Sequence, residues 1–221
     1  MKINIPDEIK GMIYTSPLDS EKMKYYTEAL AWLALRYCFD EYKDLTLSDA
    51  PDLQDINNMI GIEVTEVAIP SIKTIDGNWL HYRKTKDEKY KVKAELYGGE
   101  IDDSSCSYPP TTSKDELECI EQILTKKMKK LPSYRKKGFR TIGLIFVLKD
   151  TPLPDTAHKW NEIAKKVHST SSEKFDVLFF LYRNALCWCD CNNYKSDYII
   201  IGEKSMNELC RYSRFIVEQN D

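Results

Sequence analysis

Two stretches of the chain carry apolar residues at the three- and four-residue spacing of an amphipathic helix. In the first, the spacing predicts a helix from residue 20 to about residue 42 that packs one face on a sheet, with Ser20 as its N-cap. Its apolar residues are Tyr26, Leu30, Leu33 and Tyr37, flanked by Ala29, Ala34 and Cys38. The second helix is predicted to begin at Ser113, where Glu116 completes a capping-box pattern.

The second helix has a charged residue within its apolar stripe. The stripe consists of Leu117, Ile120, Leu124 and Leu131, with Ile123 and Met128 at its flank. Its spacing requires a further member at position 127, and that residue is a lysine. Because an unpaired buried ammonium is costly, Lys127 is expected to have a partner, unless its side chain runs past its apolar neighbours to water.

The second half of the chain contains several apolar segments of strand length. Two of them, residues 142–148 and 175–182, are continuously apolar, which is typical of strands covered on both faces. Shorter strands are predicted at residues 186–191 and 198–201, and helices at residues 155–168 and 205–217. The pattern therefore predicts an α/β fold with a central mixed β-sheet flanked by helices on both faces.

Residues 51–66 form the most informative pattern of the chain, and they predict two short strands joined by a tight turn. The turn is predicted at Asn57 and Asn58, because asparagine tolerates the positive φ that such turns require. In the second strand the residues alternate, so that Glu63 and Thr65 share a face opposite to that of Ile62 and Val64.

Residues 67–112 are interpreted as an insertion into a single domain of residues 1–221. Strand character is visible at residues 72–84 and 90–97, and Gly98-Gly99 and Pro109-Pro110 interrupt any regular element. The insertion could lie beside the functional site and contact a substrate, or it could be a plain surface excursion.

Composition narrows the classes of function. The net charge is -3, which excludes a globally basic nucleic-acid binder but allows a local basic patch. The seven cysteines are odd in number and unevenly placed, which indicates free thiols in a reducing compartment. No segment has the apolar length of a signal peptide or a membrane span, so we expect a cytoplasmic protein without a membrane partner.

The predicted hairpin brings two carboxylates into one region. Glu63 lies within a run of β-branched residues, where a carboxylate needs a cation or a hydrogen-bond donor. Asp52 lies at the start of the partner strand and is a candidate neighbour across the hairpin. Two such acids suit a hard divalent cation.

At these residues the sequence resembles the PD-(D/E)XK nuclease superfamily, which has the restriction-endonuclease-like fold. Pro51-Asp52 matches the first half of the motif, and Glu63-Val64-Thr65 falls where the second half belongs, with Thr65 in place of the lysine. The resemblance implies a nuclease that hydrolyses phosphodiester bonds with Mg²⁺ or Mn²⁺. It also implies that Asp52, Glu63 and the carbonyl of Val64 hold the metal.

Three further residues acquire candidate roles from the resemblance. Lys127 is hypothesised to reach Glu63 or the scissile phosphate and to take the role that Thr65 cannot fill. Glu28 lies on the first helix, where some nuclease families carry an additional active-site glutamate, although a solvated surface residue is the simpler interpretation. Asp55 is a weaker candidate ligand, because alternation along the strand places it on the face opposite to Asp52.

Basic residues at the end of the second helix and after it indicate how nucleic acid would be held. A basic face would bind the phosphate backbone by charge, without reading sequence, and it consists of Lys126, Lys130, Arg135, Lys136 and Lys137. The resemblance thus implies a metal-dependent nuclease, with DNA favoured over RNA as substrate. Two alternatives remain: a catalytically inactive nuclease-fold module that binds nucleic acid or protein, and a component of a bacterial or phage conflict system. In the latter, a partner supplies missing parts. The partners that remain open are another protein and a second copy of the chain as a homodimer.

Overall fold

A computed structural model of the chain describes residues 3, 5–14, 16, 18, 19, 21–148 and 157–219, and for residues 157 and 158 only the backbone. The described residues fall into two compact units, one within residues 1–67 and 121–221 and the other within residues 68–120. The interpretation of residues 67–112 as an insertion into a single domain stays a prediction.

The described part of the first unit is built on a seven-stranded mixed sheet whose strands lie in chain order. Strand β2 is antiparallel to both β1 and β3, the strands β3, β4 and β5 are parallel, and β6 and β7 return antiparallel. The strands are β1 (Thr46–Leu47), β2 (Leu53–Asp55), β3 (Ile60–Val67), β4 (Thr141–Leu148), β5 (Val177–Tyr182), β6 (Ala185–Asp190) and β7 (Lys195–Ile200). The predicted α/β class with a mixed sheet is confirmed.

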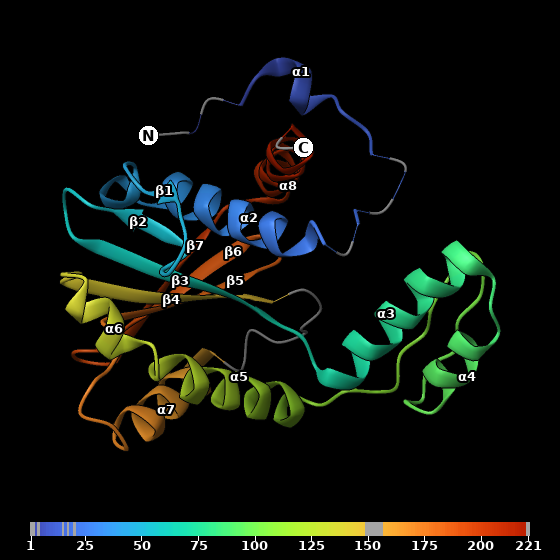
Figure 1. Ribbon diagram of the computed structural model, residues 1–221. Coiled ribbons are helices and arrows are strands. Elements are labelled where there is room, and N and C mark those ends of the chain that lie inside the picture. Colours follow the sequence, from blue (N-terminus) through green and yellow to red (C-terminus); the bar gives the residue numbers. More distant parts are fainter. Residues whose placement is uncertain are drawn as a thin grey trace. The chain divides into compact units, whose positions relative to one another are not determined.

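Helices cover both faces of this sheet (Figure 1). The helices α2 and α8 lie together on one face, and α6 and α7 lie on the other. The helical elements of this unit are α1 (Asp7–Lys10), α2 (Met23–Cys38), the 3₁₀ turn η1 (Asp40–Tyr42), the part of α5 (Ser113–Met128) from residue 121 on, α6 (Leu131–Lys136), α7 (Ala157–His168) and α8 (Glu203–Gln219). The predicted N-cap Ser20 lies outside the described residues.

The alternation along the parallel strands decides which face each side chain reaches. Ile62 and Val64 of β3 pack into the core beneath α2 and α8. On the opposite face, Trp160 of α7 stacks on Phe180 of β5, with 4.1 Å between the ring centroids. Glu63, between Ile62 and Val64, therefore points away from the α2 face, and its contacts come from α5 and α6.

The second unit corrects the two strands predicted between residues 72 and 97. Residues 70–85 form α3 (Pro70–Thr85) and residues 89–95 form α4 (Lys89–Glu95). The apolar residues Ile72, Ile75, Trp79 and Tyr82 recur at helical spacing, and Ile75 and Tyr82 are buried. The β-branched and aromatic residues of this stretch suggested strands. The spacing of its apolar residues, every three to four positions, is instead that of a helix.

The turn of the β2–β3 hairpin also differs in detail from the prediction. The turn lies between Asp55 and Ile60 as expected, but the residue with positive φ is Met59 (φ 55°) and not Asn57 or Asn58. Asp55 organises the turn, because its carboxylate accepts hydrogen bonds from the backbone N–H and the side-chain amide of Asn58, at 3.0 and 2.6 Å.

The N-terminus of α5 is capped one residue earlier than predicted. Thr112 and Asp115 form the reciprocal capping pair: the Asp115 carboxylate accepts the Thr112 N–H at 2.8 Å, and the Thr112 hydroxyl accepts the Asp115 N–H at 3.3 Å. The predicted partner, Glu116, is instead buried with 1% of its surface exposed. Within the described part of the chain neither of its carboxylate oxygens has a hydrogen-bond partner. Burial raises the pKa of Glu116 from 4.5 to about 7.

Replacing Glu116 by glutamine is expected to stabilise the protein at pH 8. The folded state binds the Glu116 proton more tightly than the unfolded state does, so the free energy of unfolding falls as pH rises from about 4.5 to about 7. The loss is on the order of 3 kcal/mol above that range. Urea unfolding of Glu116→Gln should match the wild type at pH 4 and exceed it at pH 8. Glu118→Gln, an exposed acid of the same helix, is the control, and equal behaviour of the two variants would contradict the expectation.

In the described ranges, none of the helices combines the length and the apolar character needed to cross a membrane.

Candidate functional site

Asp52 is held in a fixed orientation at the start of β2. Its carboxylate is buried, and the oxygen Oδ2 accepts a hydrogen bond from the backbone N–H of Val64 at 2.7 Å. This bond joins the segment before β2 to the middle of β3. Burial and the nearby charge of Glu63 raise the pKa of Asp52 above its ordinary value, although the Val64 hydrogen bond and the ammonium groups of Lys127 and Lys130 act in the opposite direction.

Gly61 allows the close approach of the two segments that carry the acids. A Cβ atom at this position would lie 2.6 Å from Cγ of Pro51 and 3.2 Å from the ring of Phe139. The residue before Asp52 can therefore pack on β3 only because position 61 has no side chain.

Replacing Gly61 by alanine is expected to lower the free energy of unfolding by about 1–3 kcal/mol, because Pro51 must move away from β3. Gly11→Ala is the matched control, since a Cβ at Gly11 meets nothing within 4 Å. Urea unfolding of both variants checks the prediction, and equal stabilities would refute it.

Glu63 is the centre of the site. It is buried, with 1% of its surface exposed, and it accepts hydrogen bonds from three side chains of the described chain. Its oxygen Oε1 lies 2.5 Å from Nζ of Lys127 and 2.6 Å from Nζ of Lys130, and its oxygen Oε2 accepts the hydroxyl of Tyr134. Burial by itself raises the pKa of Glu63, but these hydrogen bonds and the lysine charges outweigh it, so the pKa is lowered.

The three donors to Glu63 all come from the α5–α6 segment. Positions 127, 130 and 134 are separated by three and four residues, so they share a face across the end of α5 and the start of α6. Lys127 also donates to the carbonyl oxygen of Val64 at 3.3 Å. Burial and the charge of Glu63 raise the pKa of Tyr134, which keeps its hydroxyl protonated as a donor. The apolar stripe predicted a partner for Lys127, and Glu63 is one of the two partners that the resemblance suggested.

Two residues of the site, Lys130 and Tyr134, had no predicted contact with Glu63. Lys130 was assigned to the phosphate-binding face, yet its ammonium bonds to Glu63. The helical spacing of both residues from Lys127 is visible in the sequence, and it is the signal that could have identified them.

The other candidate residues have different surroundings. Thr65 is half-buried on β3, two residues from Glu63, and pairs in register with Phe146 of β4. Glu28 is buried on α2 and forms an ion pair of 3.4 Å with Lys24. Burial and the charges of Asp52 and Glu63 raise the pKa of Glu28, although Lys24 opposes them, so its carboxylate is electrostatically coupled to both acids. Asp55 is engaged in the hairpin turn, where it accepts hydrogen bonds from Asn58.

The other basic residues predicted to bind the phosphate backbone divide into exposed ones and ones that contact the rest of the protein. Lys126 and Lys136 are exposed, and Lys137 donates to the carbonyl oxygen of Ala50 at 2.7 Å, just before Pro51-Asp52. Arg135 binds the Asp176 carboxylate at 2.8 Å and the carbonyl oxygens of Phe139 and Arg140. These contacts stabilise the connection from α6 to β4, and a phosphate-binding role for Arg135 stays a prediction.

The oxygen atoms predicted to hold a metal already contact a cation. The Lys127 ammonium lies between Oε1 of Glu63 and the carbonyl oxygen of Val64, which are two of the three predicted ligands. Among the described residues, no three His, Cys, Asp or Glu side chains gather closely enough to hold a metal ion. Two carboxylates and a carbonyl nevertheless suit Mg²⁺, which keeps several of its waters. The donor set therefore fits the ion.

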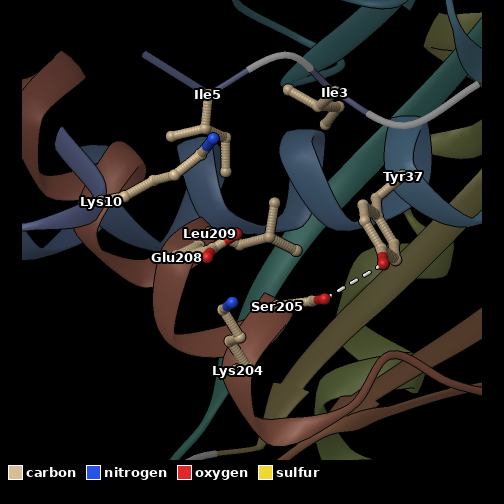
Figure 2. Close-up of a pocket in the computed structure, with 8 residues that line it drawn as sticks. All are labelled: Ile3, Ile5, Lys10, Tyr37, Lys204, Ser205, Glu208 and Leu209. Atoms are coloured by element: carbon tan, nitrogen blue, oxygen red, sulfur yellow. Dashed lines mark hydrogen bonds between the residues drawn. The ribbon is translucent and has the colours of Figure 1, made fainter. Parts of the chain in front are cut away.

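A cavity in the first unit lies apart from these residues (Figure 2). It has a volume of about 410 Å³ and is bordered by the N-terminal segment, α1, α2 and α8. Its lining includes Lys10, Tyr37, Lys204 and Glu208, and the hydroxyl of Tyr37 donates to Ser205 at 3.1 Å. Neither Asp52, Glu63 nor Lys127 borders it. We place the candidate site at Glu63, because buried charges converge there.

Comparison with protein-family models, with curated proteins and with solved structures finds no match to this chain.

Proposed function

We propose that this chain is a metal-dependent nuclease of the restriction-endonuclease-like fold, which hydrolyses phosphodiester bonds in DNA or RNA. One observation carries the proposal: the buried Glu63 of β3 lies within the electrostatic reach of Asp52 and receives the Lys127 ammonium from α5. Two acids from adjoining segments of a hairpin and an amine from the helix that crosses them are the arrangement that the motif resemblance implies.

Each residue of the site would have a separate role in hydrolysis. Asp52, Glu63 and the Val64 carbonyl would hold Mg²⁺ or Mn²⁺, which when bound polarises a phosphoryl oxygen and lowers the pKa of a water molecule. Lys127 is placed to orient the attacking water or to offset negative charge on the phosphorane-like transition state. The Val64 N–H fixes the Asp52 carboxylate, and the Tyr134 hydroxyl fixes that of Glu63.

The exposed lysines around the site would hold the substrate. Lys126, in the last turn of α5, and Lys136, on α6, are exposed and lie near Lys130 in the chain. Such ammonium groups bind phosphate by charge and carry no sequence information, so the proposed activity is not sequence-specific at these contacts.

The hydrogen bonds of Glu63 favour a second candidate function, binding without cleavage. Both of its oxygens are already bound by donors of the described chain, and no third acidic ligand completes the set. A nuclease-fold module that binds nucleic acid or a protein partner without cleaving it would have this arrangement.

A cleavage assay separates the two functions. Purified protein is incubated with single- and double-stranded DNA and RNA, with Mn²⁺ or with EDTA. Metal-dependent cleavage supports the nuclease. Binding without cleavage of any substrate in the panel supports the non-catalytic module.

A further inference from the structure

Two ammonium groups share one oxygen atom at the candidate site. The Nζ atoms of Lys127 and Lys130 lie 2.5 and 2.6 Å from the same Oε1 of Glu63. The two positive charges repel each other, and Glu63, the carboxylate that both ammonium groups contact, neutralises only one of them. The other is offset by the nearby charge of Asp52, which a divalent cation would take up. One ammonium then becomes available to a further anion, and the contacts of the two lysines decide which of them can leave Glu63.

Lys127 is the anchored lysine. Its side chain is 19% exposed, and its ammonium also donates to the Val64 carbonyl oxygen at 3.3 Å. Lys130 is 49% exposed, and among the described residues its ammonium hydrogen-bonds only to Glu63. An ion pair made by a half-exposed lysine contributes little, because water competes for the ammonium and the long side chain loses rotamer freedom. Of the two lysines, Lys130 is therefore the one that can leave Glu63 and bind another anion.

We propose that Lys130 is an exchangeable ammonium, which binds Glu63 in the metal-free protein and turns outward to bind a nucleic-acid phosphate when a divalent cation takes up Oε1. The proposal rests on the proposed metal-dependent function. On release, Lys130 lies next to the exposed side chains of Lys126 and Lys129 and adds a charge to the basic face. Divalent cation and phosphate backbone therefore bind with positive coupling, since each favours the outward position of Lys130.

The charges of the site favour the release of Lys130 from Glu63 when a divalent cation binds. Asp52 and Glu63 together carry two negative charges when ionised, which a divalent cation matches. Lys127 would share the Val64 carbonyl oxygen with the cation, since that oxygen has two lone pairs, whereas Lys130 would then face a cation without a counter-ion in the site. A phosphate oxygen is the counter-ion that the proposed substrate brings.

The first arm of the test measures Mn²⁺ affinity by calorimetry, with the full-length wild type, Lys130→Gln and Lys129→Gln. Lys129 is an exposed lysine beside Lys130 and serves as the matched control. Lys130→Gln should bind Mn²⁺ about three- to tenfold more tightly, because one ammonium fewer competes for Oε1 of Glu63. Lys129→Gln should bind it like the wild type.

The second arm measures binding of a short fluorescein-labelled DNA duplex by anisotropy, in Ca²⁺ and in EDTA. Ca²⁺ should tighten binding by the wild type and by Lys129→Gln, and this effect should be lost in Lys130→Gln. An unchanged Mn²⁺ affinity of Lys130→Gln, absence of Mn²⁺ binding, or undiminished coupling in Lys130→Gln would each overturn the proposal. Absence of cleavage with tighter Mn²⁺ binding by Lys130→Gln would refute only the nuclease activity.

Discussion

Replacing Glu63 by glutamine is expected to lower the rate of nucleic-acid cleavage at least about a hundredfold. The amide has the shape of the carboxylate but lacks the charge that would hold a divalent cation and that fixes Lys127 at 2.5 Å. Single-turnover cleavage with saturating substrate measures the loss. Glu121→Gln is the control, because Glu121 pairs with Lys166 at 2.6 Å and not with the site, and it should cleave like the wild type. Equal rates for wild type and Glu63→Gln would contradict the proposed role.

The same variant is expected to change how stability depends on pH. The folded state lowers the pKa of Glu63, so the carboxylate contributes stability above its ordinary pKa of 4.5, and this contribution is lost as pH falls through the lower folded value. Glu63→Gln should therefore be less stable than the wild type at pH 7, by about 1–3 kcal/mol, and the difference should shrink in acid. Urea unfolding at pH 7 and below pH 4 measures both values.

Replacing Lys127 by alanine is expected to lower the cleavage rate about a hundredfold or more and to leave DNA binding within a few-fold of the wild type. Lys127 lies in a largely buried position and contacts Glu63 and Val64, so its charge acts at the site and not on the distant backbone of the substrate. Lys126→Ala, one residue earlier and exposed, should show the reverse: weaker binding and little change in the single-turnover rate at saturation. Similar effects of the two variants would contradict a specific role for Lys127.

The local pattern of the sequence predicted most strands of the sheet and the need of Lys127 for a partner, and the resemblance suggested Glu63 as that partner. The continuous apolar runs at residues 142–148 and 175–182 predicted β4 and β5, since strands covered on both faces have few polar positions. Lys127 was predicted to need a partner because it interrupts an apolar stripe, and the structure places its ammonium on Glu63.

The predictions of the α5 cap and of strands between residues 72 and 97 were wrong, because the sequence allows two local structures at each place. Thr112 with Asp115 and Ser113 with Glu116 are both capping pairs by spacing, and only tertiary burial of Glu116 selects the first. Residues 70–85 contain many β-branched and aromatic side chains, but their burial follows a helical period. The contact of Lys130 with Glu63 was not predicted, because Lys130 was grouped with the exposed lysines and its spacing of three residues from Lys127 was not used.

Diffraction from a crystal soaked in Mn²⁺ tests the central claim most directly, because the account requires the carboxylates of Asp52 and Glu63 to hold one divalent cation. It predicts an anomalous peak bonded to both carboxylates, with the Lys130 side chain turned away from Glu63. A fully ordered site without such a peak, in which Lys127 and Lys130 both remain on Glu63, would contradict it.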